Sequence, residues 1–445
     1  MTAKIRSVYV CQNCSAQFTN WAGQCSKCGE WNTLLETVDT FSSEKSVGRS
    51  LLKNAAAGVV IETLDKIKIS QTARIKVGIE EFDRVLGGGF VPGQVILLAG
   101  EPGIGKSTLI TQVCKSLGNS NILYVCGEES PAQIKLRAQR MSYDGANLST
   151  LQETDSYIIE QVLYSNSQNA QKSKFSFLVV DSIQTLYTKD LMSTAGSVAQ
   201  IKECSQRLAR AAKNMNICAI LVGHVTKDGE IAGPKVLEHL VDTVLYMEGD
   251  PQHLYRILRT TKNRFGAVSE VGMFEMVESG IREVTNPSEM FVSKQEAGMI
   301  GSCVAVAMEG FRPILYEVQA LAVKTSFGYP KRTASGFNVN RLQVLLAVLE
   351  KRCKLPCYQY DIYLNIAGGF KINDSASDLA VCLAIASAIL EKPLKHNVAL
   401  FGEVGLLGEV RSVPHAQKRL REARRLGYKS SDSYKWVNDC IKQLI

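Results

Sequence analysis

The sequence predicts an α/β protein in which a largely parallel sheet is preceded by a small cysteine-rich module and followed by a separate α+β domain. Between about Val77 and Glu283, short apolar runs alternate with amphipathic segments of helix length, which is typical of a parallel sheet with helices on both faces. Four of the thirteen cysteines fall before residue 30. From about Asn286 onward, a third region has strands and long helices of its own, enough chain for an independent domain.

The composition is that of an ordinary globular protein with several domains. Of the 445 residues, 45% are apolar and 21% are charged, which excludes wholesale disorder and fibrous repeats. No run approaches the roughly 18 to 20 apolar residues that cross a bilayer, so we expect no membrane partner. The N-terminus lacks the apolar stretch of a secretion signal, and most cysteines lie singly in apolar segments, so we expect a reducing, cytoplasmic location. The net charge of +8 permits a polyanionic partner without proving one.

In chain order, we expect a C4 zinc finger over residues 1–35, a polar linker over 36–65, the sheet domain over 66–285 and the α+β domain over 286–445. The strands of the sheet domain are expected at Val95–Ala99, Ile122–Cys126, Phe177–Val180, Ile217–Val222 and Thr243–Met247. The last domain is expected to contain strands at Ser302–Met308, Leu315–Leu321 and Ile362–Ile366, and helices at Asn340–Lys351, Ala376–Leu390 and His415–Leu426.

The N-terminal cysteines have the spacing of a zinc site. Two CxxC pairs are separated by ten residues, and four thiolates on two tight turns can surround one Zn²⁺ ion. Metal binding would then fold a segment that is too short to build its own core. Two redox-active pairs or incidental thiols are the alternative. The expected ligands are Cys11, Cys14, Cys25 and Cys28.

A phosphate-binding loop follows the first strand of the sheet domain. The segment GEPGIGKS lies between an apolar run and a helical segment, which is the context that this motif requires. Backbone amides at Gly103 and Gly105 can turn toward phosphates, Lys106 can reach the β and γ phosphates, and Ser107 supplies a hydroxyl for Mg²⁺. A chance glycine-rich turn is the alternative. The expected residues of the ATP site are Gly100, Glu101, Pro102, Gly103, Ile104, Gly105, Lys106, Ser107 and Thr108.

Carboxylates end two other strands of the sheet domain. Asp181 ends the buried run FLVVD at the carboxyl edge, where it can hold the metal's water shell, although it is also a possible helix N-cap. Glu128 and Glu129 follow Ile122–Cys126, which we expect from sequence order to lie beside the phosphate-loop strand. One of the two glutamates should orient the attacking water. Glu129 is the favoured candidate, and Glu128 is the alternative.

These motifs together resemble the bacterial RadA (Sms) family, on the cysteine knuckle, GEPGIGKS, GEES at Gly127–Ser130, VVDSIQT at Val179–Thr185 and KNRFG at Lys262–Gly266. The resemblance implies a RecA-like P-loop ATPase core, related to the ring helicases of the DnaB group. It further implies a DNA-dependent ATPase of homologous recombination and DNA repair. Such a motor, expected to be a hexameric homo-oligomer, would act on single-stranded and branched DNA and promote branch migration beside the RecA recombinase.

The resemblance also assigns roles to the basic residues of the core. Lys262 and Arg264 would reach the γ phosphate bound by a neighbouring subunit, or DNA; a solvated basic turn is the alternative. His224 ends a buried strand and is either a γ-phosphate sensor or a structural histidine. Lys227 and Lys235 would contact DNA phosphates, or they are simple surface lysines.

The C-terminal region resembles the proteolytic domain of the Lon family, a chemistry that needs a serine nucleophile and a lysine base. Ala376 stands at the expected position of the nucleophile and Gln417 at that of the lysine, so we expect no peptidase activity. If the alignment with the Lon signature is shifted by one residue, Ser375 or Ser377 takes the position of the nucleophile and Lys418 that of the lysine base, which is the alternative. We therefore expect a Lon-protease-like domain that serves as architecture.

A basic strip in this region suggests a duplex-binding surface, with a solvated helix as the alternative. Two rival functions also stay open: an ATP-dependent Lon-like protease with the zinc finger as adaptor, and a nucleotide-gated switch of the circadian-clock ATPase type. The strip contains Arg411, Lys418, Arg419, Arg421, Arg424, Arg425 and Lys429.

Overall fold

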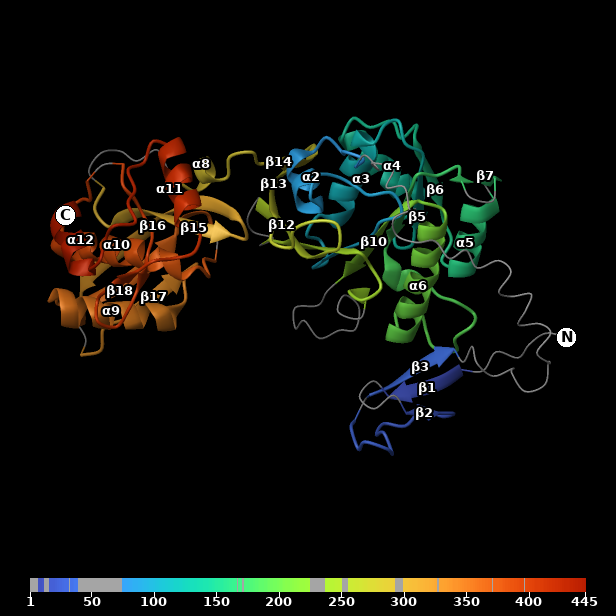
Figure 1. The fold of residues 1–445 in the computed structure, drawn as a ribbon, viewed down its shortest axis with the longest axis horizontal. Coiled ribbons are helices and arrows are strands. Elements are labelled where there is room, and N and C mark those ends of the chain that lie inside the picture. The colour runs from blue at the N-terminus through green and yellow to red at the C-terminus, as the bar shows by residue number, and fades with distance from the viewer. Residues whose placement is uncertain are drawn as a thin grey trace, which may run out of the picture. The chain divides into compact units, whose positions relative to one another are not determined.

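The computed structural model divides the chain into two compact units, drawn in blue to yellow and in orange to red in Figure 1. The first contains Met1–Val268 and Phe274–Glu283, and the second contains Ser269–Met273 and Val284–Ile445. The structure describes residues 7–11, 16–31, 33–38, 74–165, 167–169, 172–224, 237–249, 255–292, 299–325, 328–369, 371–395 and 397–445.

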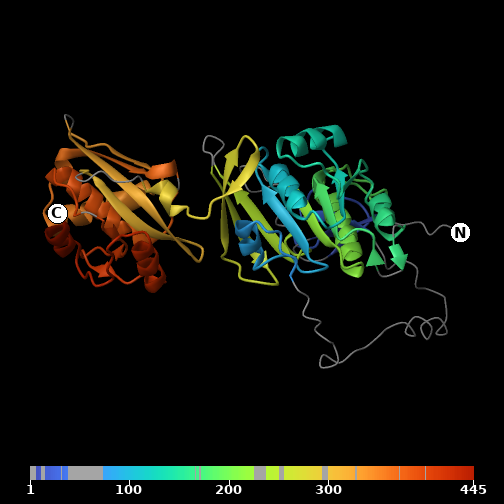
Figure 2. The same ribbon diagram turned by 90° about the horizontal axis from the view of Figure 1, so that it is seen from above.

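The described part of the first unit is built on a nine-stranded sheet in the order β14-β13-β12-β11-β4-β10-β9-β5-β6, to which β13 also contributes Val271–Met273 of the second unit. The six strands from β11 to β6 pair in parallel, as the alternating pattern predicts, whereas β12 pairs antiparallel with β11. From above, these strands lie side by side (Figure 2). Their bounds are β4 Val95–Gly100, β5 Ile122–Cys126, β6 Leu148–Leu151, β9 Phe177–Asp181, β10 Cys218–His224, β11 Thr243–Glu248, β12 Tyr255–Asn263, β13 Val271–Val277 and β14 Gly280–Glu283.

Helices cover both faces of this sheet because successive strand residues point to opposite sides. On β4, Ile96 and Leu98 pack in one apolar core with α2, α3 and α4, while Val95 and Leu97 pack in a second core with α5 and α6. Figure 1 shows the two helix groups on either side of the strands. The helices are α2 Glu80–Leu86, α3 Lys106–Ser116, α4 Pro131–Arg140, α5 Ser156–Ser165 and α6 Val198–Asn214.

The strand order corrects one prediction from sequence. The strand β5 does not lie beside β4, because β10 and β9 are inserted between them. After α3 the chain crosses to a distant place in the sheet, and the later strands β9 and β10 occupy the positions between β4 and β5. In this register His224 pairs with Gly100, so the end of β10 borders the phosphate loop.

The second unit has its own sheet, in the order β17-β18-β16-β15-β19 among the described residues, and its own helices, as predicted. Helix α10 is apolar on nearly all sides and lies buried against β15, β16, α9 and α12. The strands are β15 Ser302–Glu309, β16 Arg312–Lys324, β17 Arg332–Ser335, β18 Tyr360–Ile366 and β19 Ala399–Leu400, with a separate pair β20 Glu403–Val404 and β21 Val410–Arg411. The helices are α8 Ser288–Phe291, α9 Val339–Cys353, α10 Asp378–Leu390, α11 Ala416–Arg425 and α12 Val437–Leu444, with the 3-10 turns η4 Cys357–Gln359, η5 Ala367–Gly369 and η6 Ser375–Ser377.

Short elements complete the described chain. Near the N-terminus, β1 pairs antiparallel with both β2 and β3. A search of the described helices finds no segment with the length and apolar character needed to span a bilayer. The remaining bounds are β1 Ser7–Cys11, β2 Gln17–Phe18, β3 Leu34–Val38, β7 Ser167–Asn169, β8 Lys172–Ser173 and η3 Ile183–Thr185.

Candidate nucleotide-binding and hydrolytic site

The phosphate loop connects β4 to α3 at the carboxyl edge of the sheet. Gly103 and Gly105 have φ angles of 75° and 111°, in the left-handed region that residues with a side chain rarely adopt. Helix α3 begins at Lys106, directly after the loop. The free amides at this helix start and the favourable end of the helix dipole therefore face the position expected for phosphates.

The side chain of Lys106 is held inside the loop. It is 3% exposed, and its Nζ donates hydrogen bonds to the carbonyls of Gly100 and Glu101, both at 2.9 Å. The same Nζ lies 3.1 Å from Nδ1 of His224. Burial lowers the pKa of Lys106 to about 8, although the charge of Asp181 and that of a nearby glutamate oppose this shift.

Nucleotide affinity should therefore weaken above pH 8. Phosphates bind the charged form of Lys106, and bound phosphates raise its pKa, so binding takes up a proton once the free site has lost it. We expect binding of a nonhydrolysable ATP analogue to be about tenfold weaker at pH 9 than at pH 7. Calorimetric titration in buffers of different ionisation enthalpy measures both the affinity and the proton uptake. An affinity that stays flat over this range contradicts the assignment.

Asp181 lies at the carboxyl edge, where the sequence predicts it. It is 5% exposed, and its Oδ2 accepts a hydrogen bond from the hydroxyl of Tyr124 at 2.7 Å. Burial, with the Asp181 charge, raises the pKa of Tyr124 well above its usual value, so this hydroxyl remains a donor. The carbonyl of Asp181 accepts from the amides of Gly127 at 2.8 Å and Glu128 at 3.3 Å. These contacts tie the end of β9 to the turn after β5.

The two glutamates after β5 point to different partners. The carboxylate of Glu128 accepts a hydrogen bond from the Ser182 hydroxyl and lies 3.2 Å from Nε2 of His224. The carboxylate of Glu129, in contrast, pairs with Arg137 of α4. The structure therefore brings Glu128 into the cluster with the loop lysine and leaves its neighbour outside it.

His224 joins these groups into one chain of contacts. Its Nδ1 faces Lys106 and its Nε2 faces Glu128, an arrangement that the tautomer with a proton on Nε2 satisfies at both ends. Its carbonyl also accepts from the amide of Gln184 at 3.2 Å. Sequence reasoning missed Tyr124, because a hydroxyl side chain within an apolar run carries no motif, and it gave no role to Gln184, although this residue lies within VVDSIQT.

The KNRFG residues do not join this cluster. The ammonium of Lys262 donates to the carbonyls of Glu238 and Val241, the latter at 2.9 Å. Burial, with the nearby charge of Arg264, lowers the pKa of Lys262. The guanidinium of Arg264 is half exposed and lies 3.2 Å from the carboxylate of Asp242.

These two cations lie at the amino edge of the sheet. Lys262 lies at the end of β12, and Arg264 directly follows that strand, beside the start of β11, where Thr243 pairs in register with Ile96. The loop begins at Gly100, at the opposite end of β4. A six-residue strand spans roughly 17 to 20 Å, which exceeds the reach of either side chain. Neither cation can therefore contact phosphates bound in the loop of its own chain.

Comparison with known proteins places this site in a family. Residues 75–288 match the KaiC family of ATPases, and residues 9–36 match the rubredoxin metal binding domain. The protein from Bacillus subtilis (strain 168) named DNA repair protein RadA is 46% identical over 435 residues, covering 96% of this chain and 92% of the relative. The chain belongs to the RadA family. The RadA protein of Brucella abortus (strain 2308) is 45% identical and covers 97% of this chain and 92% of the relative.

Membership of the RadA family confirms the expected RecA-like ATPase core with a zinc-binding module before it. A solved structure described as the RadB recombinase is similar with a TM-score of 0.38 and 24% identity. It covers 47% of this chain and 99% of the RadB chain.

The N-terminal module of this RadA family member fits a metal ion. The thiols of Cys11, Cys25 and Cys28 all lie within 4.8 Å of one another, and those of Cys11 and Cys28 are 3.6 Å apart. Tetrahedral Zn–S bonds of about 2.3 Å place sulfur atoms roughly 3.8 Å apart. The donor set therefore suits Zn²⁺. The fourth predicted ligand, Cys14, lies outside the described residues, as do Lys227 and Lys235.

The positions aligned with the Lon dyad differ in environment. Ala376 is fully buried in η6, whereas Gln417 is exposed on α11. Of the flanking serines, Ser375 donates to the carboxylate of Glu403 at 3.1 Å, and Ser377 is buried. Neither an alanine methyl nor a carboxamide supplies a nucleophile or takes its proton.

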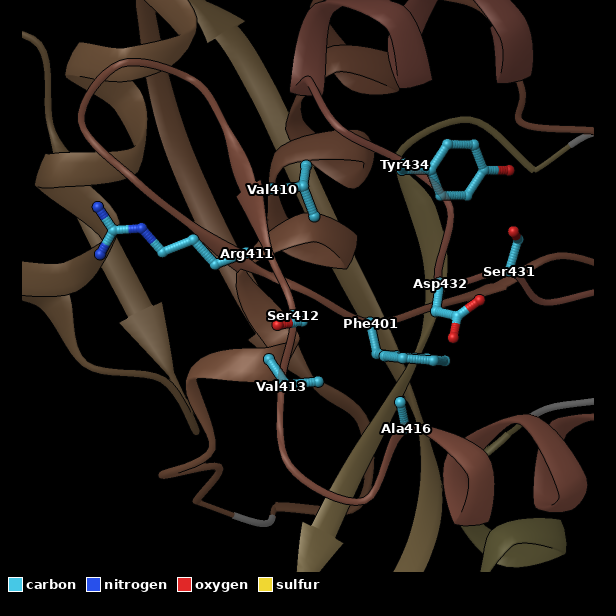
Figure 3. Close-up of a pocket in the computed structure, with 9 residues that line it drawn as sticks. All are labelled: Phe401, Val410, Arg411, Ser412, Val413, Ala416, Ser431, Asp432 and Tyr434. Atoms are coloured by element: carbon cyan, nitrogen blue, oxygen red, sulfur yellow. The ribbon is translucent and has the colours of Figure 1, made fainter.

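A small cavity of about 80 Å³ lies in this unit (Figure 3). It presents the hydroxyl of Ser412 and the carboxylate of Asp432, while Arg411 extends away from the ring of Tyr434. Among the described residues, no lysine lines this cavity. The lining residues are Phe401, Val410, Arg411, Ser412, Val413, Ala416, Ser431, Asp432 and Tyr434.

One residue of the predicted basic strip is buried, contrary to the expectation from sequence. Arg419 is 2% exposed, so it is not part of any surface. Its guanidinium donates to the carbonyl of Val306 at 2.6 Å and pairs with Asp374 at 2.7 Å. The helical pattern places basic residues around α11 but does not reveal which of them faces an internal partner.

Proposed function

We propose that this RadA family member is a DNA-dependent ATPase of DNA repair and homologous recombination. In this proposal it forms a homo-oligomeric ring, a hexamer, on single-stranded and branched DNA in the cytoplasm and promotes branch migration together with RecA. The name of its relatives, DNA repair protein RadA, supports the repair role. The match to the KaiC ATPases supports ATP hydrolysis.

One observation supports the proposed ring. Lys106 and His224 lie at the carboxyl edge of the sheet, whereas Lys262 and Arg264 lie at its amino edge. Arg264 is half exposed and too far from its own loop to contact the nucleotide there. A neighbour in a head-to-tail ring would place this arginine at the adjacent subunit's site, so that hydrolysis depends on assembly.

Within each site, Lys106 would bind the β and γ phosphates and Ser107 would hold Mg²⁺ together with Asp181. When bound, Mg²⁺ supplies positive charge that neutralises the phosphates. Glu128 replaces Glu129 in our proposal as the residue that orients the attacking water, because Glu128 faces the lysine through His224. Lys262 and Arg264 would serve the neighbour, and Zn²⁺ would bind Cys11, Cys14, Cys25 and Cys28.

We propose that residues 286–445, which make up most of the second unit, are a Lon-like architectural domain. In this proposal it follows a zinc finger over 1–35, a linker over 36–65 and the ATPase core over 66–285. The buried alanine at the nucleophile position supports a role without peptide hydrolysis.

Extension of a synthetic three-strand junction tests the proposed function. With ATP, the protein should move the branch point along the DNA, and with a nonhydrolysable analogue it should bind without movement. RecA should increase the yield of extended product. Equal products with and without hydrolysable nucleotide contradict the motor.

A further inference from the structure

A buried arginine contacts the middle of the phosphate loop from a strand on the other side of β11. Arg256 of β12 is 6% exposed, and its Nε donates a hydrogen bond of 3.0 Å to the carbonyl of Ile104. One terminal nitrogen of the same guanidinium donates to the carbonyl of Tyr255 at 2.7 Å. Burying a guanidinium is costly unless hydrogen bonds satisfy it, so this contact is a fixed part of the site.

The carbonyl that accepts this hydrogen bond belongs to the most conformationally free part of the phosphate loop. Ile104 stands between Gly103 and Gly105, the two left-handed glycines, and its side chain is 2% exposed. Glycines lower the cost of turning the amides toward phosphates, but they also let the empty loop adopt other conformations. A donor fixed to the Ile104 carbonyl restricts this freedom, because the peptide plane that carries the carbonyl also carries the next amide.

The absence of a side chain at Gly249 leaves room for the stem of Arg256. A Cβ on Gly249 would lie 2.7 Å from Cδ of Arg256 and 2.8 Å from the carbonyl of Tyr255. Any residue other than glycine at 249 would therefore displace the arginine stem or the strand. The loop is also packed from this side, where a Cβ on Gly105 would meet the sulfur of Met276 at 3.2 Å.

We propose that Arg256 is a positioning residue for nucleotide binding: it holds the Ile104 peptide so that the loop amides face the phosphates before ATP arrives. It acts through the loop rather than on the reacting atoms. Loss of the contact should weaken nucleotide affinity more than it slows the chemical step, because bound phosphates themselves can order the loop. The inference rests on the ATP-binding part of the proposed function and requires no DNA.

The test compares Arg256→Met, which keeps an apolar stem, with Arg256→Lys, which keeps a donor. A charge-assisted hydrogen bond of this kind corresponds to about tenfold or more in affinity. We expect the Met variant to raise KM for ATP and Kd for a nonhydrolysable analogue by about tenfold with kcat changed less than about threefold, and the Lys variant to fall between it and wild type.

Arg259→Met is the matched control, since Arg259 lies on the same strand and pairs at 3.0 Å with Glu248 at a partly exposed position. Its KM should equal that of wild type. Unchanged KM in a folded Arg256→Met variant overturns the proposal, and so does a loss of thermal stability with KM and kcat both retained. If the Met variant does not fold, Arg256→Lys decides: a raised KM with retained kcat supports the role, and an unchanged KM overturns it. A failure of DNA to stimulate turnover leaves this comparison intact.

Discussion

A Glu128→Gln variant is expected to bind ATP and to hydrolyse it at least about hundredfold more slowly than wild type. The carboxylate of Glu128 lies within contact of His224 and Ser182 and faces the loop lysine through the histidine. A carboxamide of the same shape keeps some of these contacts but cannot accept a proton from the attacking water. Multiple-turnover ATPase rates, with equilibrium binding of ATP measured alongside, separate lost chemistry from lost binding.

Glu129→Gln is the matched control, because it makes the same chemical change one residue further along. The Glu129 carboxylate pairs with Arg137, so its loss should leave turnover within a few-fold of wild type. Equal losses in both variants, or a larger loss at Glu129, would show that the resting geometry does not identify the base.

An Arg264→Ala variant is expected to lose on the order of a thousandfold in turnover, because a guanidinium that stabilises transition-state charge from a neighbouring subunit contributes on that scale. The fold should survive this change. The buried carboxylate of Asp242 keeps Lys213 at 2.9 Å and the amide of Val95 at 3.1 Å as partners. Arg282→Ala is the control, since Arg282 is an exposed arginine paired with Glu275, and its turnover should be normal.

Mixing identifies where this arginine acts. Lys106→Ala subunits lack a working phosphate loop but retain Arg264, whereas Arg264→Ala subunits retain the loop. Each variant alone should be nearly inactive, and mixed assemblies should regain turnover because one subunit supplies the arginine to the next. A mixture as inactive as its components would place Arg264 in another role, such as a DNA contact.

Five strands of the core, β4, β5, β9, β10 and β11, could be predicted from sequence because each is an apolar run bounded by turns, whereas β6 mixes polar and apolar residues and was not predicted. The phosphate loop and Asp181 could be predicted because they end such runs. The order of the strands could not be predicted. The sequence between β4 and β5 does not indicate how many strand positions separate the two, so sequence order alone places β5 beside β4. The order is decided by the packing of later strands, β9 and β10, which are distant in sequence.

The choice between adjacent residues is equally hidden from sequence. Glu128 and Glu129 share a motif, and only the turn after β5 decides which carboxylate meets His224 and which meets Arg137. Arg256 carries no motif at all, since its partner is a backbone carbonyl 152 residues away. Motifs thus identify the chemistry of this site, whereas tertiary contacts decide which side chains take part.

ATP turnover with and without single-stranded DNA tests most directly whether hydrolysis is coupled to a nucleic-acid strand. The rate should be measured with the full-length protein at several protein concentrations and several salt concentrations. We expect oligonucleotide to raise the rate, the increase to grow with protein concentration as subunits assemble, and the effect to decline steeply with added salt. A rate that is the same with and without DNA at every concentration would contradict the account.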